Sequence, residues 1–401
     1  MGKIQQMMKS NPIVRFRLLA AALICTGLTS LFSCSKSDEK DPVITDEIEL
    51  AIRNMSLRQK VGQMFYGRPE MLDTTIHWFV GDDLVAISMQ EVNDVMRNVN
   101  KDYPIGGIIL YAHNIDDSTQ LESFIGQLRQ LNGSPLLCID EEGGRVARIA
   151  NNPKFDVTKY ESMDSIGRTR DPHNAYECAN TIGSYLKRYG FDIDFAPVAD
   201  VNTNPENVVI GKRAFSDDPY VASGMVTSYL QGLDDAGIVG CIKHFPGHGD
   251  TKNDTHTGYA ASNKTWAEML DCEMITFKAG IAWGTQLIMT AHIAAPNVTG
   301  SDVPSTLSPV ILNDKLRGEL GYNNIIVADA MEMGAITLHY SNADAAVLAV
   351  QAGVDILLGP KNLIEAFDAV MDAVASGQIT ETRINQSVRR ILKLKQKLDR
   401  L

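Results

Sequence analysis

The stretch GIVGCIKHFPGHGDTKNDTHTG, residues 237–258, joins a short apolar run to a polar loop. The run from Ile238 to Ile242 has the composition of a buried strand. The loop that follows contains glycine and carries the ionisable side chains Lys243, His244, His248, Asp250, Asp254 and His256. A strand that leads into such a loop is the usual form of a site at the carboxyl edge of a parallel sheet, because the strands hold the loops rigidly. We therefore predict that this loop is part of a catalytic site.

Strand-like apolar runs alternate with longer segments of helical period along the whole chain, which is typical of repeated βα units. The predicted strands are 61–66, 107–111, 136–139, 192–197, 239–242, 287–291, 325–327 and 356–358. Most of them are followed by a polar residue. Eight parallel strands with polar groups at one edge predict an α/β fold of the (β/α)8 TIM-barrel type in a single domain.

Helix punctuation agrees with this fold. Ser308 precedes a proline and predicts a helix start, while Gly321 and Gly353 predict helix ends just before strands. The last helix has Ile384 and Val388 on one apolar face. The segment 68–101 is long for a βα loop and is predicted to hold either an extra helix or a lid.

The first residues have the layout of a secretory signal, with a basic start and an apolar run at 18–31 that is short for a membrane span. Cys34 follows Leu31-Phe32-Ser33, which resembles the lipobox of bacterial lipoproteins. We predict a signal peptide over 1–33, lipidation of Cys34, a polar tether over 34–46 and the barrel over 47–401. The predicted location is the bacterial cell envelope. An ordinary cleaved signal or an uncleaved anchor is the alternative.

Removing residues 1–33 takes away four basic and no acidic residues, so the net charge goes from −12 to −16. Such an acidic body argues against nucleic acid or an anionic membrane surface as the main partner. The membrane contact is predicted to run through the lipid alone, and no protein partner is implied. The remaining cysteines, 138, 178, 241 and 272, are scattered, which predicts buried free thiols instead of a disulfide framework.

Two groups carry the predicted chemistry. Asp329 follows an apolar strand directly, where it can act as nucleophile, metal ligand or acceptor for a substrate hydroxyl; a helix cap is the structural alternative. Asp254 and His256 are two residues apart, so in an extended loop they lie on the same side. A carboxylate beside an imidazole favours the protonated ring and gives a proton donor near neutral pH.

A cup of charged groups is predicted around the barrel rim. Asp140 begins DEEGGRVARI, in which Arg145 and Arg148 are predicted on a short helical turn, and Arg213 lies on a long loop after the fourth strand. Donors and acceptors together suit sugar hydroxyls. The histidine pair at 244 and 248 has the HxxxH spacing of zinc sites, but Pro246 and Gly247 break the helix that this spacing requires. We predict no metal and no organic cofactor.

The segment KHFPGHGDTKNDTH resembles the signature of glycoside hydrolase family 3, and specifically of its β-N-acetylhexosaminidase branch. Further blocks resemble the family in family order: SLRQKVGQMF, GGIILYAHNI, DEEGGRVARI, FAPVADVN, VIGKRAFSDDP, MTAHIAAP, PSTLSP, AGVDILLGP and RINQSVRRILKLK. The family fold is a (β/α)8 barrel. Larger members carry a second α/β domain, which we do not expect here because the chain stops at the last barrel helix. Ala330, Glu141 and Thr257 depart from the pattern of many relatives.

The resemblance implies a retaining exo-β-N-acetylglucosaminidase that releases terminal GlcNAc from peptidoglycan fragments or other β-GlcNAc glycans. It implies that Asp329 is the nucleophile and that His256, paired with Asp254, is the general acid/base. The residues implied to hold the sugar are Asp140, Arg148, Arg213, Lys243 and His244, whereas His248 is expected to structure its loop. The alternatives are a β-glucosidase or β-GlcNAc phosphorylase of the same family, and a non-catalytic sugar-binding lipoprotein.

Overall fold

The computed structural model describes residues 46–76, 79–80, 83–84, 87–252 and 260–401. Its centre is a sheet of eight strands in which every neighbouring pair is parallel. In sheet order the strands are β11 (Ile325–Ala328), β9 (Leu287–Thr290), β7 (Val239–Phe245), β6 (Ile193–Asp194), β5 (Leu136–Ile139), β4 (Gly107–Leu110), β1 (Phe65–Gly67) and β12 (Leu357–Leu358). A parallel bridge between Val327 and Ile356 brings the last strand against β11 and closes the sheet. The predicted (β/α)8 barrel is confirmed.

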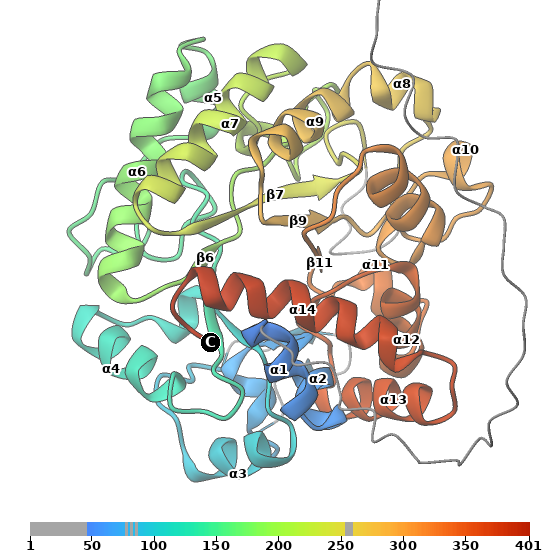
Figure 1. Ribbon diagram of the computed structural model, residues 1–401. Coiled ribbons are helices and arrows are strands. Elements are labelled where there is room, and N and C mark those ends of the chain that lie inside the picture. The colour runs from blue at the N-terminus through green and yellow to red at the C-terminus, as the bar shows by residue number, and fades with distance from the viewer. Residues whose placement is uncertain (1–45, 77–78, 81–82, 85–86, 253–259) are drawn as a thin grey trace, which may run out of the picture. The chain divides into compact units, whose positions relative to one another are not determined.

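Helices surround the strands (Figure 1). They are α1 (Glu47–Asn54), α2 (Leu57–Gln63), α3 (Asp94–Asp102), α4 (Ser118–Leu128), α5 (Met163–Gly167), α6 (Pro172–Tyr189), α7 (Pro219–Asp235), α8 (Trp266–Leu270), α9 (Glu273–Trp283), α10 (Pro296–Thr299), η5 (Val310–Glu319), α11 (Gly334–Thr337), α12 (Asn342–Ala352), α13 (Leu363–Ala375) and α14 (Glu381–Lys397). Short turns of helix are η1 (Pro69–Leu72), η2 (Ala112–Asn114), η3 (Gly211–Arg213) and η4 (Ser305–Leu307). Strand pairs outside the barrel are β2 (Phe79–Val80) with β3 (Asp83–Leu84), and β8 (Ala260–Ala261) with β10 (Ile293–Ala294).

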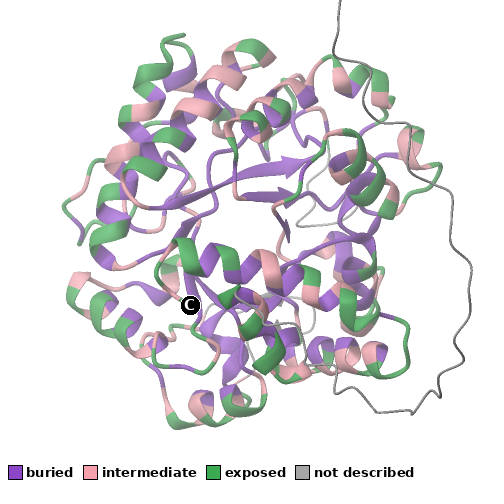
Figure 2. Ribbon diagram, viewed as in Figure 1, coloured by how far each residue is buried: buried purple, intermediate pink, exposed green. Residues whose placement is uncertain are grey.

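The core lies in the barrel and under the inner faces of the helices, while the outer faces are exposed (Figure 2). Helix α14 illustrates how the sequence produces this arrangement. Thr380 caps its first turn by accepting a hydrogen bond from the amide of Arg383, and Ile384, Val388 and Ile391 are fully buried. Each such side chain contributes roughly 1.5–3 kcal/mol by leaving water. The predicted apolar face of this helix is confirmed.

Most predicted strands are confirmed, and three differ clearly in their bounds. The first was placed at 61–66, but residues 57–63 form α2 and the strand starts at Phe65. Ser56 and Gln59 make a reciprocal capping box there, a local helix signal that outweighs the apolar pattern. The fourth keeps only residues 193–194 of the predicted 192–197 in the sheet.

The strand expected at 239–242 extends to Phe245, so Lys243 and His244 belong to β7 and not to the loop. The peptide bonds Lys243–His244 and Phe245–Pro246 are cis. Two helices end just before the predicted glycines. Gly321 and Gly353 both adopt positive φ, which the last turn of a helix commonly requires of the residue after it. The segment 68–101 holds η1, the paired strands β2 and β3 and nearly all of α3, the helix between β1 and β4, so the choice between an extra helix and a lid stays a prediction.

The cysteines of the described part of the chain are free thiols, as predicted, although Cys272 is only half-buried. Residues 1–45, including Cys34 and the predicted signal and tether, lie outside the described residues. Within the described ranges, no helix is both long enough and apolar enough to span a membrane.

Candidate active site

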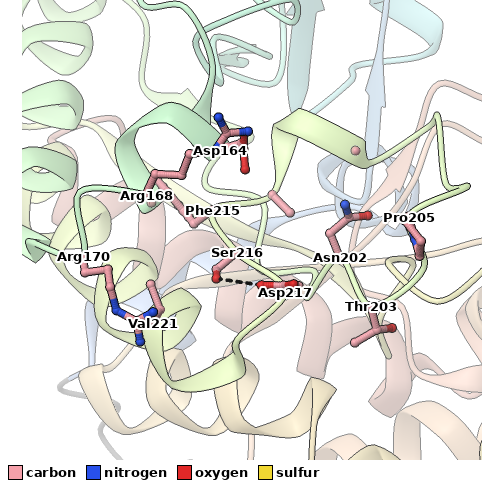
Figure 3. A pocket seen from close by; sticks show the side chains of 13 residues that line it. Asp164, Arg168, Arg170, Asn202, Thr203, Pro205, Phe215, Ser216, Asp217 and Val221 are labelled. Atoms are coloured by element: carbon pink, nitrogen blue, oxygen red, sulfur yellow. Dashed lines mark hydrogen bonds and ion pairs between the residues drawn. The ribbon is translucent and has the colours of Figure 1, made fainter.

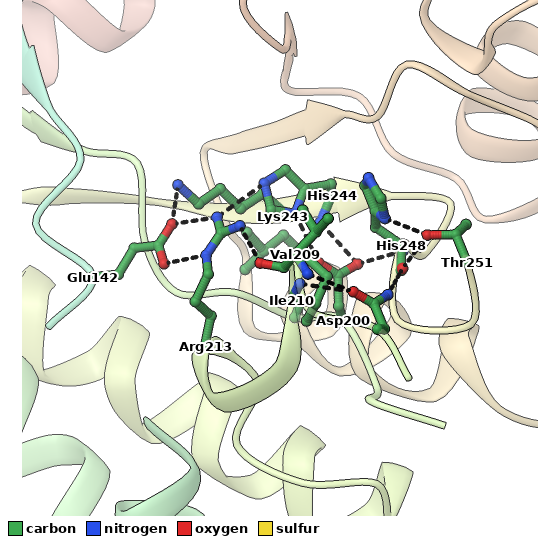
Figure 4. Close-up of polar contacts among 12 residues, drawn as sticks. Glu142, Asp200, Val209, Ile210, Arg213, Lys243, His244, His248 and Thr251 are labelled. Atoms are coloured by element: carbon green, nitrogen blue, oxygen red, sulfur yellow. Dashed lines mark hydrogen bonds and ion pairs between the residues drawn. The ribbon is translucent and has the colours of Figure 1, made fainter. Parts of the chain in front are cut away.

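The carboxyl edge of the barrel, called the mouth below, gathers the predicted sugar cup. The Lys243 ammonium lies 2.9 Å from Asp140 Oδ1 and 2.6 Å from Glu142 Oε1. Arg213 grips Glu142 with two hydrogen bonds of 2.7 and 2.8 Å (Figure 4). Arg148 lies 3.3 Å from Asp140 Oδ2. Four predicted residues from three segments therefore meet in one network, held together by a carboxylate, Glu142, that sequence reasoning missed.

Pairing keeps these groups charged despite their burial. Burial alone would raise the pKa of Glu142, but Arg213 and Lys243 outweigh it and hold that pKa well below its usual range. Burial would lower the pKa of Lys243, yet Asp140 and Glu142 raise it above its ordinary value. The pKa of Asp140 is lowered, because Lys243 and Arg148 outweigh its burial. The cup is therefore a set of fixed charges at neutral pH.

The turn after β5 positions Asp140 and Arg148. Glu141 is fully buried and accepts hydrogen bonds from the backbone amides of residues 148, 149 and 150 and from the hydroxyl of Tyr185. Gly143 and Gly144 both have positive φ, and Gly143 pairs with Val146 in an antiparallel bridge. The segment is a tight glycine turn, so the helical turn predicted for Arg145 and Arg148 is wrong: the carboxylate of Glu141 takes the amides that a helix would use.

Asp200 holds the segment 244–248 in place through three hydrogen bonds. It accepts hydrogen bonds from His244 Nδ1 at 2.7 Å, from the amide of His244 at 3.2 Å and from the amide of His248 at 2.7 Å. His248 then contacts Thr251 Oγ1 at 2.7 Å through Nδ1 (Figure 4). His244 Nε2 lies 3.4 Å from Arg213 and so joins the cup. His248 fits its expected role in structuring the loop.

Asp329 directly follows β11 at the mouth and is half-buried. Its amide donates to the carbonyl of Thr290 at 3.2 Å, and its Oδ1 accepts a hydrogen bond of 2.8 Å from the amide of Ala330. The amide of Met331 in turn donates to Leu358 on the neighbouring strand. Backbone bonds to both flanking strands therefore fix the residues around this carboxylate.

A second charged cluster at the mouth was not predicted. Arg68 and Glu332 form an ion pair, and the Arg68 guanidinium stacks over the ring of Tyr111 at 4.1 Å from its centre. Arg148 lies 5.5 Å from the same ring, so Tyr111 links this cluster to the cup. Burial raises the pKa of Glu332 to about 7, although Arg68 opposes the change. A signal existed in the sequence: Arg68 comes just after a strand, as most of the predicted site residues do.

The predicted acid/base pair, Asp254 and His256, lies outside the described residues. The two flanks of that segment are joined by Asp250, which accepts a hydrogen bond from Thr203 at 3.3 Å and from Ser262 at 3.5 Å. Lys264 lies 3.8 Å from Asp250. Arg145 donates to the carbonyl of Val209, which also accepts a hydrogen bond of 3.2 Å from Arg213 of the cup.

A separate cavity of about 510 Å³ is lined in part by the loop that carries Asp200 and Arg213. Its lining includes Arg168, Asn202 and Phe215 (Figure 3). Of the predicted site residues that the structure describes, none lines this cavity. The predicted site residues that the structure describes therefore lie outside this cavity.

Fold and site together define a (β/α)8-barrel protein with a charged cup at its carboxyl edge. The family described as "Glycosyl hydrolase family 3 N terminal domain" matches residues 56–394. The chain is 35% identical over 325 residues to Beta-hexosaminidase A of Pseudoalteromonas piscicida, covering 74% of this chain and 54% of that protein. It is 33% identical to a Beta-hexosaminidase of Xylella fastidiosa, covering 71% of this chain and 84% of the relative.

Among solved structures, the glycoside hydrolase family 3 beta-N-acetylglucosaminidase of Paenibacillus sp. matches with a TM-score of 0.78 and 35% identity. That match covers 86% of this chain and 63% of the other. The chain belongs to glycosyl hydrolase family 3. The predicted family and the predicted enzyme class, glycoside hydrolase, are confirmed. The chain spans about half the length of the Pseudoalteromonas relative.

Proposed function

We propose that the protein is a retaining exo-β-N-acetylglucosaminidase that releases terminal GlcNAc from peptidoglycan fragments or other β-GlcNAc glycans. The observation that carries the proposal is the convergence of Asp140, Arg148, Arg213, Lys243 and His244 in one network at the edge where β11 presents Asp329. The names of the relatives, Beta-hexosaminidase and beta-N-acetylglucosaminidase, support the choice of sugar.

The cup is suited to bind neutral sugar hydroxyls. Asp140 is the most exposed acid of the network, with 16% of its side chain accessible, against 1% for Glu142. Lys243 and Arg148 occupy both of its oxygens from inside the protein and hold the carboxylate in one orientation. A fixed carboxylate has lone pairs left for hydroxyl donors, so binding a sugar costs little reorganisation there.

The proposed reaction has two steps. Asp329 attacks the anomeric carbon while His256, supported by Asp254, donates a proton to the leaving oxygen; the imidazole then takes a proton from the water that attacks the glycosyl-enzyme. Most retaining glycosidases use two carboxyl groups about 5–5.5 Å apart, and here a histidine–aspartate pair replaces one of them.

The substrate is tested with nitrophenyl β-GlcNAc and nitrophenyl β-glucoside, with the products analysed in the presence and absence of phosphate. We expect GlcNAc from the first substrate, little turnover of the second and no sugar phosphate. A preference for the glucoside would identify a β-glucosidase, and a sugar 1-phosphate would identify a phosphorylase. If the wild type turns over neither substrate, the alternative of a non-catalytic sugar-binding protein is favoured.

The proton donor is tested with His256→Ala. The variant should lose much more activity on a poor leaving group than on nitrophenol, because a good leaving group departs with little protonation. Equal losses on both would exclude His256 as the acid.

We also propose that Cys34 carries a lipid that anchors the protein in the bacterial cell envelope, on the basis of the basic start, the apolar run and the lipobox-like sequence. Intact mass and membrane fractionation test this proposal. The wild type should carry the mass of the lipid and remain with membranes, and Cys34→Ser should lose both properties. A wild type without lipid would refute the anchor.

A further inference from the structure

We propose that His292 is the positioning residue for Asp329: its imidazole fixes the peptide that aims the carboxylate. This inference rests on the proposed function, because it assigns a role in the same reaction. It starts from a side chain that the proposed reaction leaves unused. His292 follows β9 at the mouth and is fully buried.

The contact between His292 and Ala330 is direct. His292 Nε2 lies 3.0 Å from the carbonyl oxygen of Ala330, the residue that follows Asp329 in the chain. A carbonyl oxygen only accepts hydrogen bonds, so Nε2 must carry the proton and donate it. The same carbonyl also accepts the amide of Met333 at 3.1 Å, which closes the turn after β11.

Two buried threonines hold the imidazole. His292 Nδ1 lies 2.8 Å from Thr306 Oγ1, and that hydroxyl lies 2.7 Å from Thr290 Oγ1 at the end of β9. All three side chains are fully buried. A ring held at both nitrogens by buried groups has one orientation, because any rotation would leave a buried polar atom unpaired.

The effect reaches the carboxylate through Ala330. The Ala330 carbonyl is held by His292, and its amide donates the 2.8 Å hydrogen bond to Asp329 Oδ1. The orientation of residue 330 therefore sets the orientation of the carboxylate oxygens. The groups that hold it are an imidazole, two hydroxyls and backbone amides, whereas the cup is held by ion pairs. A misplacement of about 1 Å at a reacting group can cost about 10²-fold in rate, so a buried bond that fixes this turn matters to the reaction.

The experiment compares His292→Gln with His292→Asn. The Gln amide nitrogen occupies the place of Nε2 and keeps the donor to Ala330, whereas Asn mimics only Nδ1 and cannot reach that carbonyl. We expect His292→Asn to lower kcat by about 10²-fold with little change in KM, and His292→Gln to remain within about tenfold of wild type. The loss in His292→Asn should be the same for good and poor leaving groups, because the proton donor is untouched.

Controls separate this inference from the proposed function. His173→Asn makes the same change on an exposed side chain of α6 and should leave kcat unchanged. If the wild type has no activity on nitrophenyl β-GlcNAc, the proposed function fails. If the wild type is active and the two His292 variants have equal kcat, the inference is overturned. Should either variant fail to fold in thermal unfolding, Thr306→Val takes its place: a lower kcat with unchanged KM supports the inference, and an unchanged kcat overturns it.

Discussion

Both edges of the barrel carry buried acids paired with cations, but in different settings. Asp355 precedes β12 at the amino edge of the barrel, called the base. Its carboxylate accepts hydrogen bonds from Arg317 at 2.6 Å, from Arg390 at 3.0 Å and from the hydroxyl of Ser387 at 2.5 Å. Arg383 completes the cluster at 3.6 Å. At the mouth, Glu142 receives Arg213 and Lys243 at similar distances. The chemistry of the pairs is the same.

The two clusters differ in how completely the protein covers their carboxylates. At the base, Arg383 also donates to the carbonyls of Val350 and Val354, and helix α14 carries this arginine over the barrel. No side-chain atom of Asp355 is exposed. At the mouth, Arg148 and Asp140 keep 24% and 16% of their side chains exposed. A carboxylate that its partners cover completely serves stability, and one that stays partly exposed can bind a ligand.

The largest effect is expected for Asp329→Asn at the mouth. Activity on nitrophenyl β-GlcNAc should fall by roughly 10⁴-fold or more, the scale on which loss of a nucleophile acts. The unfolding midpoint should hardly change, because the side chain is half-buried and the amide keeps its shape. Steady-state kinetics and thermal unfolding check both points, and retained activity would remove Asp329 from the mechanism.

Asp355→Asn at the base should do the opposite. It leaves three half-buried arginines without their buried carboxylate, so the free energy of unfolding should fall by about 3–5 kcal/mol, while the activity per folded molecule stays the same. Urea unfolding measures this change. Asp372→Asn, on the exposed face of α13, is the matched control and should change little. A loss of kcat without a loss of stability in Asp355→Asn would break the distinction between the two edges.

Glu142→Gln should combine the two effects. The amide keeps its volume but no longer neutralises Lys243 and Arg213, so we expect KM to rise by at least about tenfold, which corresponds to about 1.4 kcal/mol of binding free energy. Stability should also fall, because two buried cations lose a shared partner. KM and urea midpoints are measured together. An unchanged KM would mean that the cup does not bind the substrate.

The smallest effect concerns pH, and the two edges should respond with opposite signs. Glu332 at the mouth has a pKa of about 7 in the fold against 4.5 in the unfolded chain, because burial disfavours its charge. Between these values the folded state holds a proton that the unfolded chain has released, so stability falls as pH rises.

Lys395 at the base contacts Gln63 and the carbonyl of Gly133, and burial lowers its pKa to about 7 from 10.5. Between these values the unfolded chain holds the extra proton, so stability rises with pH. Each slope is at most about 1.4 kcal/mol per pH unit. Urea unfolding from pH 5 to pH 10 should show Glu332→Gln flattening the acid limb and Lys395→Met the alkaline limb. Unchanged limbs would contradict the assignment.

Short-range patterns carried the prediction of the fold. Leu136–Ile139 forms β5 as predicted, and Gly353 ends α12, because strand runs and glycine caps depend on neighbours within a few residues. The first strand was misplaced where a capping box at Ser56 competed with the apolar pattern. Glu142 had a local signal that was not used: in an extended segment it lies two residues after Asp140 and therefore on the same side.

The sequence alone thus determined the barrel, its family and the side chains offered at the mouth, since these follow from local periodicity and from motifs in a fixed order. Only the tertiary structure decided which of them pair. Arg213 pairs with Glu142, 71 residues away in the chain. Asp200 accepts hydrogen bonds from His244 and His248, and His292 donates to the carbonyl of Ala330 across 38 residues. The physical reason is that closing the barrel sets which strand ends are neighbours, and hydrogen bonds of about 3 Å form only between groups that this closure brings together.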